Sequence, residues 1–253
     1  MTLTSAPTAP PSATVAVIGA GRLGGVLAAA LRAAEFTVTG PLGRDDGIPR
    51  TDIALLCVPD AEIPRAAQTA RRARLIGHVS GATGLDDVDF SVHPLQTFTG
   101  TEGPEIFRGI GAAIAGRAAE GRATAEQIAL ALGARPFEVD DAHRAGYHAA
   151  ASLASNLALA VLDAAEQVAL AAGIRHPRGL LAPLVERTVA NWTHTGAGAA
   201  LTGPLVRGDQ ATVDRQRDAV TAANAELAPL FDELVARARD ISRSRTERPE
   251  ART

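Results

Sequence analysis

Between residues 14 and 140, short runs of β-branched residues alternate with alanine-rich stretches of helical periodicity. This alternation is typical of a parallel sheet that is wrapped by helices. We expect strands over residues 15–18, 37–39, 53–58, 75–79, 91–93, 110–115 and 136–139. Between them we expect helices over residues 23–34, 63–72 and 123–132. The pattern therefore predicts an α/β domain with a doubly wound parallel sheet over residues 14–140.

The β-like runs end near residue 140, and long stretches of helical periodicity follow. We expect three long helices, over residues 143–172, 177–195 and 212–239. Gly173 suits a helix C-terminus, Pro177 suits a first helical position, and the glycine-rich residues 195–203 suit a loop. The sequence thus predicts an all-α C-terminal domain over residues 141–240. Residues 241–253 have too little apolar content to pack, so we expect a disordered tail there.

The composition excludes several classes of function. The net charge is −3, and without a basic surface we expect neither nucleic acid nor a membrane as a partner. All 25 basic residues are arginine, which excludes Schiff-base chemistry and a P-loop lysine. Residues 145–162 are uncharged and largely apolar. Their alanine content and polar interruptions favour a helix buried between domains over a membrane span.

Cysteine and histidine usage narrows the chemistry further. Cys57 is the single cysteine and lies in an apolar run, which excludes an internal disulfide and favours a reducing cytoplasm. Residues 1–13 lack the basic and apolar segments of a secretion signal, so we expect a disordered tail and a cytoplasmic protein. The six histidines show no metal-ligand spacing, and we expect no metal.

Gly19, Gly21 and Gly24 form the pattern GxGxxG between an expected strand and an expected helix. In this setting the first glycine permits a tight turn, the second lets the backbone approach a pyrophosphate, and the third allows close packing of helix on strand. Arg22 and Leu23 open the helix, whose N-terminus attracts negative charge. The motif predicts a bound dinucleotide, and the alternative is an ordinary glycine-rich turn.

The choice of cofactor depends on the end of the second strand. An acidic residue there typically binds the ribose hydroxyls of NAD, but this chain has Arg44 as its nearest charged side chain. An arginine suits the 2′-phosphate of NADP, so we expect NADP (NADPH). Because two aspartates follow Arg44, a solvated loop arginine is the alternative. Two further turns at the carboxyl edge of the sheet are expected to line the same cleft, at Val58, Pro59, Ser80 and Gly81.

Two segments supply candidates for catalysis. His93 ends a short expected strand, and Gln96 follows in a loop, where both could contact substrate or cofactor; a structural turn is the alternative. His148, Ser152 and Asn156 recur every four residues and are expected to share one face of a helix. No charged residue accompanies them, which favours a partly buried cleft over a solvated stripe, with a network inside a helical bundle as the alternative.

A reduced carbonyl or imine needs a proton donor, and histidine has a well-matched pKa. We therefore expect His148 to donate, with His93 as the second candidate, and Ser152 and Asn156 to orient the substrate. Arg207 could hold a substrate carboxylate with Asp209 nearby. In the structural alternative, Asp209 caps the following helix and pairs with Arg207.

With GAGRLG, VPD, HPLQTF, YHAAASLASN and LTGPLVRGD in this order, the chain resembles a bacterial family of Rossmann-like proteins with an α-helical C-terminal domain of uncharacterised function. That family is similar to ketopantoate reductases, pyrroline-5-carboxylate reductases, β-hydroxyacid dehydrogenases and deazaflavin-dependent NADP reductases. The resemblance implies a C-terminal domain like that of 6-phosphogluconate dehydrogenase, a substrate bound between the domains, and a homodimer formed through the helical domain.

The chain departs from the pattern of these related reductases at one position. Ketopantoate reductases and β-hydroxyacid dehydrogenases carry a lysine four residues before an asparagine on the first C-terminal helix; Asn156 matches the asparagine, and Ser152 replaces the lysine. Either a histidine supplies the proton or that chemistry is lost. We expect an NADP-dependent reductase of a small oxo acid or imine, with ketopantoate the leading substrate. The alternatives are a non-catalytic NADP-binding sensor or scaffold and a deazaflavin-dependent NADP reductase.

Overall fold

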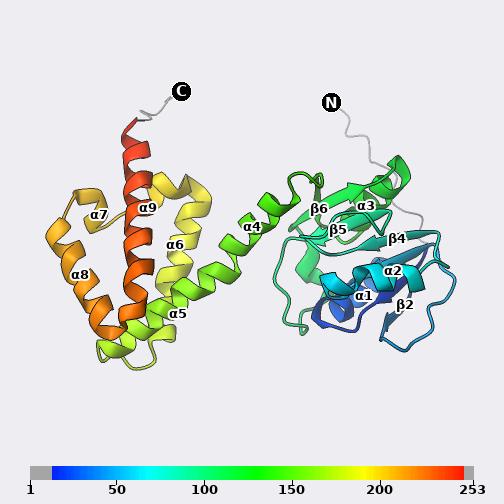
Figure 1. The fold of residues 1–253 in the computed structure, drawn as a ribbon, viewed down its shortest axis with the longest axis horizontal. Helices are drawn as coiled ribbons and strands as arrows, with labels where there is room; N and C mark the ends of the chain where they lie inside the picture. The colour runs from blue at the N-terminus through cyan, green and yellow to red at the C-terminus, as the bar shows by residue number, and fades with distance from the viewer. Residues whose placement is uncertain (1–12, 248–253) are drawn as a thin grey trace. The chain divides into compact units, whose positions relative to one another are not determined.

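The computed structural model describes residues 13–247, and the expected tail residues 1–12 and 248–253 lie outside the described residues. The chain divides into two units, one that ends at Ser155 and one that begins at Asn156. This division falls later than the domain boundary expected at residue 140, because the first helix after the sheet belongs to the same unit as the sheet. Figure 1 shows the strands in the first unit and long helices in the second.

The first unit contains a seven-stranded sheet in the order β2-β1-β3-β4-β5-β6-β7. The strands are β1 (Thr14–Ile18), β2 (Thr37–Leu42), β3 (Ile53–Leu56), β4 (Leu75–His78), β5 (Phe90–Pro94), β6 (Gly111–Gly116) and β7 (Arg135–Glu138). The expected strands and the doubly wound α/β class are confirmed. One correction is that β5 and β6 pair antiparallel. A parallel pair needs a crossover element, and only the short 3₁₀ helix η2 (Pro104–Phe107) lies between them.

Helices cover both faces of this sheet, and each face has its own core (Figure 1). The helices α1 (Arg22–Ala33) and α3 (Ala119–Ala131) contribute to one core, and α2 (Ile63–Thr69) contributes to the other. Along β1, Val15 and Val17 pack with α1, whereas Ile18 packs with α2. Successive side chains of a strand point to opposite faces, which is why a continuous apolar run builds both cores. The two cores hold the strands in place, and with them the turns at the carboxyl edge of the sheet.

The second unit is entirely helical among the residues described. Its helices are α5 (Asn156–Ala171), α6 (Pro177–Ala200), α7 (Pro204–Arg207), α8 (Gln210–Ala223) and α9 (Ala228–Glu247), with the 3₁₀ turn η3 (Ala225–Leu227) before α9. Three expectations are corrected. The loop expected at residues 195–203 is partly helical, because α6 is interrupted at Gly196 (φ 74°, ψ 167°) but continues to Ala200. The single helix expected over residues 212–239 divides at Asn224, and α9 continues into the tail expected from residue 241.

The helix expected over residues 143–172 is two helices, α4 (Arg144–Ala154) and α5. The break lies at Ser155, whose φ of −127° and ψ of −84° are outside the helical region. Among the described residues, the stretch Arg144–Ala171 is long and apolar enough to cross a membrane by length and composition alone. Only 6% of its most apolar window is buried. The expectation of a buried central helix is therefore not confirmed.

Candidate functional site

The glycine turn after β1 is as tight as the motif predicts. A Cβ on Gly19 would lie 2.3 Å from the carbonyl oxygen of Cys57, and a Cβ on Gly24 would lie 1.9 Å from the carbonyl oxygen of Gly19. Gly19 also has a φ of +114°, which favours glycine. The first and third glycines are thus required by the packing of α1 against β1 and β3.

Gly21 differs from its two neighbours in the motif. A Cβ added there would meet no protein atom within 4 Å, and the backbone has an ordinary extended conformation. Packing within the chain therefore does not explain this glycine. Gly21 is also the N-cap of α1, which has no side-chain cap and no acidic residue in its first turn. The positive end of the helix is thus open for an anion at the point where Gly21 leaves room.

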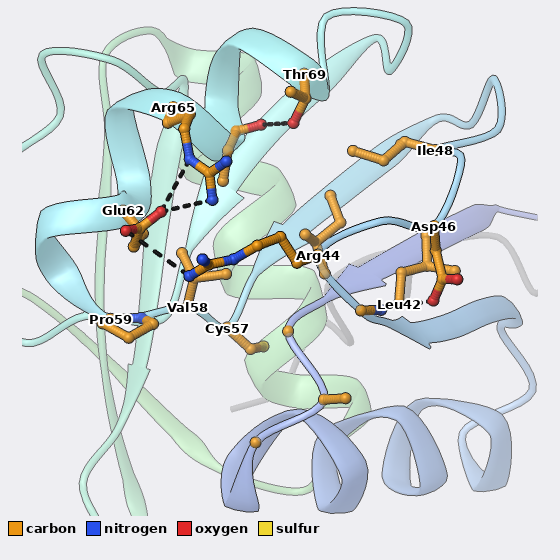
Figure 2. Close-up of a pocket in the computed structure, with 16 residues that line it drawn as sticks. Leu42, Arg44, Asp46, Ile48, Cys57, Val58, Pro59, Glu62, Arg65 and Thr69 are labelled. Carbon is orange, nitrogen blue, oxygen red and sulfur yellow. Dashed lines mark hydrogen bonds and ion pairs between the residues drawn. The ribbon is translucent and has the colours of Figure 1, made fainter.

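A cavity of about 350 Å³ adjoins this turn (Figure 2). Its walls come from the segments that follow β1, β2 and β3 and from one side of α2. The lining includes the apolar residues Leu42, Ile48, Val58 and Ala66. The strand order reverses between β1 and β3, because β2 lies on one side of β1 and β3 on the other. The cavity therefore lies at the topological switch point, where α/β sheets bind their ligands.

Charged side chains gather on one side of the cavity. In Figure 2, Arg44 from the loop after β2 and Arg65 from α2 both point toward Glu62. The Glu62 carboxylate lies 2.7 Å from the Arg65 guanidinium and 4.0 Å from that of Arg44. Asp46 faces its own loop, where its carboxylate accepts a hydrogen bond from the Gly43 N–H at 2.7 Å. One carboxylate thus bridges two exposed guanidinium groups at the cavity.

The turn after β4 lies at the same edge of the sheet. The Ser80 hydroxyl accepts hydrogen bonds from the N–H groups of Ala82 and Thr83, so it shapes the turn. Beneath it, buried His78 accepts a hydrogen bond at Nδ1 from the Ser80 N–H, and its Nε2 lies 3.0 Å from the Gly84 carbonyl oxygen. Because Nδ1 accepts, Nε2 carries the proton and donates to this carbonyl. Desolvation lowers the pKa of His78 and favours this neutral form.

His93 lies near the carboxyl end of β5, and the expected strand position is confirmed. Its Nδ1 lies 2.5 Å from the Tyr147 hydroxyl oxygen, and the two rings meet edge to face with centroids 5.6 Å apart. The His148 ring also meets the His93 ring edge to face, with a centroid distance of 6.3 Å. A Cβ on Gly81 would lie 2.8 Å from the His93 ring and 2.9 Å from the His148 ring. The structure thus brings Gly81, His93 and His148 together with Tyr147.

A buried guanidinium supports this cluster from α4. The Arg144 side chain is only 3% exposed, and it donates to Asp141 and to the Ser91 hydroxyl, both at 3.0 Å. Burial, with the charges of His148 and Arg144, lowers the pKa of His93 to about 4. Burial raises the pKa of Tyr147 to about 12. At neutral pH the imidazole is therefore uncharged and the phenol keeps its proton.

The helix face expected to carry His148, Ser152 and Asn156 is interrupted. His148 and Ser152 share α4, but the break at Ser155 separates them from Asn156, which begins α5 in the second unit. The four-residue spacing assumed one continuous helix, and that assumption is wrong at Ser155. The roles expected for these three residues stay predictions.

The three candidate residues expected in loops, Gln96, Arg207 and Asp209, lie in different surroundings. The Gln96 side chain is exposed and accepts a hydrogen bond from the N–H of Thr97. Asp209 caps α8, accepting from the Thr212 N–H at 3.1 Å and from its hydroxyl at 2.7 Å, as the structural alternative predicted. No ion pair involves Arg207 within the described part of the chain, so the pairing expected in that alternative is not seen.

The sequence reasoning missed Arg65, Glu62, Arg144 and Tyr147. For the last two, a signal was present, because Arg144, Tyr147 and His148 stand at positions i, i+3 and i+4 of one helix and so share a face. Arg65 and Glu62 had no such signal, since their proximity to Arg44 depends on how the loop after β2 folds against α2.

The fold and the glycine turn define the chain as a Rossmann-like protein with a helical C-terminal part. It belongs to the family described as a domain of unknown function (DUF2520), which matches residues 110–238. The match begins at β6, so it includes Tyr147 and His148 but not the glycine turn. The resemblance expected from the sequence motifs is confirmed. No curated protein matches the chain.

Solved structures share this fold over most of the chain. A Bacteroides fragilis protein with the provisional name NADP oxidoreductase is 20% identical, with a TM-score of 0.76, over 91% of this chain and 99% of its own. Protein TM1727 from Thermotoga maritima is 22% identical, with a TM-score of 0.76, over 92% and 100%. Pyrroline carboxylate reductase from Plasmodium falciparum, solved with NADP bound, is 11% identical, with a TM-score of 0.52, over 90% and 98%. These similarities show the fold.

Proposed function

We propose that the protein is an NADP-dependent oxidoreductase that reduces a small oxo acid or imine. The observation that carries the proposal is Gly21, which leaves space that no protein atom fills, at an uncapped helix N-terminus beside a cavity at the switch point of the sheet. The names of the Bacteroides and Plasmodium structures, one an NADP oxidoreductase and the other a reductase with NADP bound, support the same class.

The residues present fit a dinucleotide. The backbone N–H groups of Arg22 and Leu23 would hold the pyrophosphate at the start of α1, next to Gly21. The apolar side chains of Ile48 and Val58 would surround the adenosine half. Arg44 and Arg65 would hold a 2′-phosphate, which would compete with Glu62 for both guanidinium groups. When bound, the reduced cofactor supplies a hydride.

Cofactor binding is tested by titrating the protein with NADPH and NADH. We expect NADPH to bind more tightly, and Gly21→Val to weaken it by at least about tenfold because the new side chain occupies the space for the pyrophosphate. Gly25→Val is the matched control, since Gly25 also has no protein atom within reach of a Cβ but lies farther along α1. Equal affinity of the two glycine variants for NADPH would contradict the site.

A second variant tests whether the site prefers NADPH over NADH. Arg44→Ala should weaken NADPH binding and leave NADH binding nearly unchanged, because only NADPH carries the 2′-phosphate. Arg50→Ala is the control, since Arg50 is exposed and does not line this cavity. An equal loss for both cofactors would mean that Arg44 serves another part of the site.

The substrate is tested by following NADPH oxidation with a panel of oxo acids and imines. Ketopantoate comes first because of the sequence resemblance, and pyrroline-5-carboxylate represents the imines. Binding of NADPH without oxidation by any member would favour a sensor or scaffold. Oxidation only by an oxidised deazaflavin would favour a deazaflavin-dependent reductase.

We also propose that a second copy of the chain covers apolar side chains of the second unit. Leu159, Leu180 and Leu184 are each more than 60% exposed, and Trp192 on α6 is 58% exposed. Leu157, Leu170 and Val189 of α5 and α6 are also exposed, so these two helices carry apolar side chains of the kind that a protein interface buries. Asp163 and Glu166 lie within α5, which suits a protein partner better than lipid.

Sedimentation velocity tests this partner. We expect a dimer for the natural chain, a monomer for the double variant Leu180→Glu with Leu184→Glu, and a dimer for Leu130→Glu, which adds one glutamate at an exposed position of α3. A natural chain that sediments as a monomer would contradict the proposal. Flotation with phosphatidylcholine vesicles would instead indicate that lipid covers these residues.

A further inference from the structure

Three segments of the first unit meet at the carboxyl edge of the sheet. They are the end of β5 with His93, the turn after β4 with Gly81, and the first turns of α4 with Tyr147 and His148. Because β4 and β5 are parallel to β1 and β3, this edge is the same one that carries the dinucleotide cavity. A substrate group that receives a hydride would therefore approach from this edge.

One hydrogen bond and two neighbouring rings hold Tyr147 in place. Its hydroxyl oxygen lies 2.5 Å from His93 Nδ1, a short hydrogen bond, and its ring meets the Phe137 ring edge to face at a centroid distance of 5.8 Å. The ring is thus fixed between β5 and β7, while the residue as a whole stays half-buried. A hydroxyl that is oriented by one partner, on a residue that is not fully buried, can serve a second partner.

We propose that Tyr147 is the catalytic proton donor of this site and that His93 is the positioning residue that returns a proton to it. The inference rests on the proposed reductase function, and it replaces His148, the donor expected from the sequence. His148 contacts the His93 ring without a hydrogen bond to it among the described residues. Its place beside Gly81 suits a wall of the site.

The proton transfer balances without a charged imidazole. As hydride reaches the carbonyl carbon or the imine carbon, the electron pair of the double bond moves to the oxygen or nitrogen. That atom takes the proton from the Tyr147 hydroxyl and leaves a phenolate. His93, with its proton on Nδ1, donates this proton to the phenolate and takes one from water at Nε2. The net change is one hydride and one proton added to the substrate, and the imidazole is neutral before and after.

The pKa values of His93 and Tyr147 agree with this order of proton transfers. Because burial and nearby positive charge lower the pKa of His93 to about 4, it carries no spare proton at neutral pH and makes a poor direct donor. The Tyr147 phenol, with its pKa raised to about 12, keeps its proton until a strongly basic atom develops on the substrate. An alkoxide or an amide anion is basic enough to take it.

Tyr147 is the only tyrosine, so its ionisation can be measured without a substrate. After a rapid jump to pH 10.5, an ordinary phenol with a pKa of about 10 would be mostly ionised. We expect almost no phenolate absorbance from the folded protein, and full absorbance once urea has unfolded it. An ordinary degree of ionisation in the folded protein would overturn the burial of the Tyr147 hydroxyl on which the inference rests.

The decisive test is single-turnover oxidation of bound NADPH by the first panel member that the natural chain reduces. Tyr147→Phe should lower this rate by about 10²–10⁴-fold with unchanged NADPH affinity. His148→Ala should lower it less, and His143→Ala, an exposed histidine at the start of the same helix, should not change it. A Tyr147→Phe rate near that of the natural chain would overturn the inference alone. A natural chain that reduces no panel member would overturn the proposed function and this inference with it.

His93 needs a measurement that a purely structural role would leave unchanged. In His93→Ala, water or buffer must reprotonate the phenolate, so turnover should become dependent on buffer concentration and added imidazole should restore part of it. The natural chain should show neither dependence. If His93→Ala loses activity with no rescue by imidazole, His93 does not return the proton.

Discussion

The two units of the chain differ in how they bury apolar residues. In the first unit, large side chains such as Phe90, Phe107 and Leu27 are fully buried in the cores of the sheet. In the described part of the second unit, the buried apolar residues are small or β-branched, namely Ala169, Pro177, Val213, Val220 and Ala228. The apolar cores thus stabilise the first unit, whereas the described part of the second unit depends more on helix caps and surface ion pairs.

The chain carries a separate reporter for each unit. Trp192 is the only tryptophan and lies on α6, and Tyr147 is the only tyrosine and lies on α4. Urea unfolding followed by tryptophan fluorescence therefore reports the second unit, and tyrosine absorbance reports the first. Variants in each unit therefore test whether the two units differ in stability as their burial suggests.

The largest effect should come from Phe90→Ala. The Phe90 ring is fully buried and lies over Gly77, where an added Cβ would come within 2.3 Å of it, so the neighbour beneath the ring has no side chain to fill the space left behind. We expect a loss of about 3–5 kcal/mol in the free energy of unfolding, seen in tyrosine absorbance. Leu205→Ala on α7 is the counterpart in the second unit and should cost clearly less. Equal losses would mean that the second unit has a core of its own.

A smaller effect should follow from lowering the pH. Burial holds the pKa values of His78 and His93 below the value of about 6.5 that histidine has in an unfolded chain. As pH falls below 6.5, the unfolded state therefore binds protons first, and stability that is complete above 6.5 is lost. For His93 the loss should continue toward pH 4, at up to about 1.4 kcal/mol per pH unit.

Urea unfolding of the first unit at pH 7, 6 and 5 measures this loss. His93→Asn should make the pH dependence shallower, because its amide does not titrate, whereas exposed His143→Ala should leave it unchanged. If the natural chain is as stable at pH 5 as at pH 7, neither imidazole is held neutral by the fold.

The sheet could be predicted from the sequence because its strands are short, β-branched and separated by turn residues. Their two-sided burial follows from the same pattern, as Val15, Val17 and Ile18 show. The breaks in the helical unit were harder to predict. Asn224 caps η3 through the Glu226 N–H, a signal inside a helical pattern that looked continuous. At Ser155 the chain leaves the helical region without any glycine or proline nearby to mark it.

The two parts of the candidate site also differ in how well the sequence predicts them. The glycine turn depends on contacts within a few residues, so its motif predicts it directly. The cluster around His93 depends on a pairing with Tyr147, which lies 54 residues away in the sequence. Periodicity along α4 identifies which residues share a face with His148, but it does not show which strand that face meets. Only the packing of α4 on the end of β5 supplies the partner.

A third prediction concerns the cap of α8. The Asp209 carboxylate satisfies the Thr212 N–H, which would otherwise be an unpaired donor in the first turn. Asp209→Ala should destabilise the second unit by about 1 kcal/mol, and Asp209→Asn should retain most of the cap. Trp192 fluorescence during urea unfolding measures both. If the alanine variant loses substrate affinity without losing stability, Asp209 belongs to a binding site and not to a cap.

The smallest effect is expected at the ion pair between α5 and α6. Arg178 donates through Nε and Nη2 to the two carboxylate oxygens of Glu166, at 2.8 and 3.0 Å, but its side chain is 83% exposed. Exposed pairs contribute only about 0–1 kcal/mol, because water screens the charges and ordering the side chains opposes the attraction. A double-mutant cycle with Arg178→Ala and Glu166→Ala should give a coupling in this range that disappears in high salt. A coupling that reaches about 2 kcal/mol and survives salt would mean that the pair is shielded from water, as it would be if the partner copy covered this part of α6.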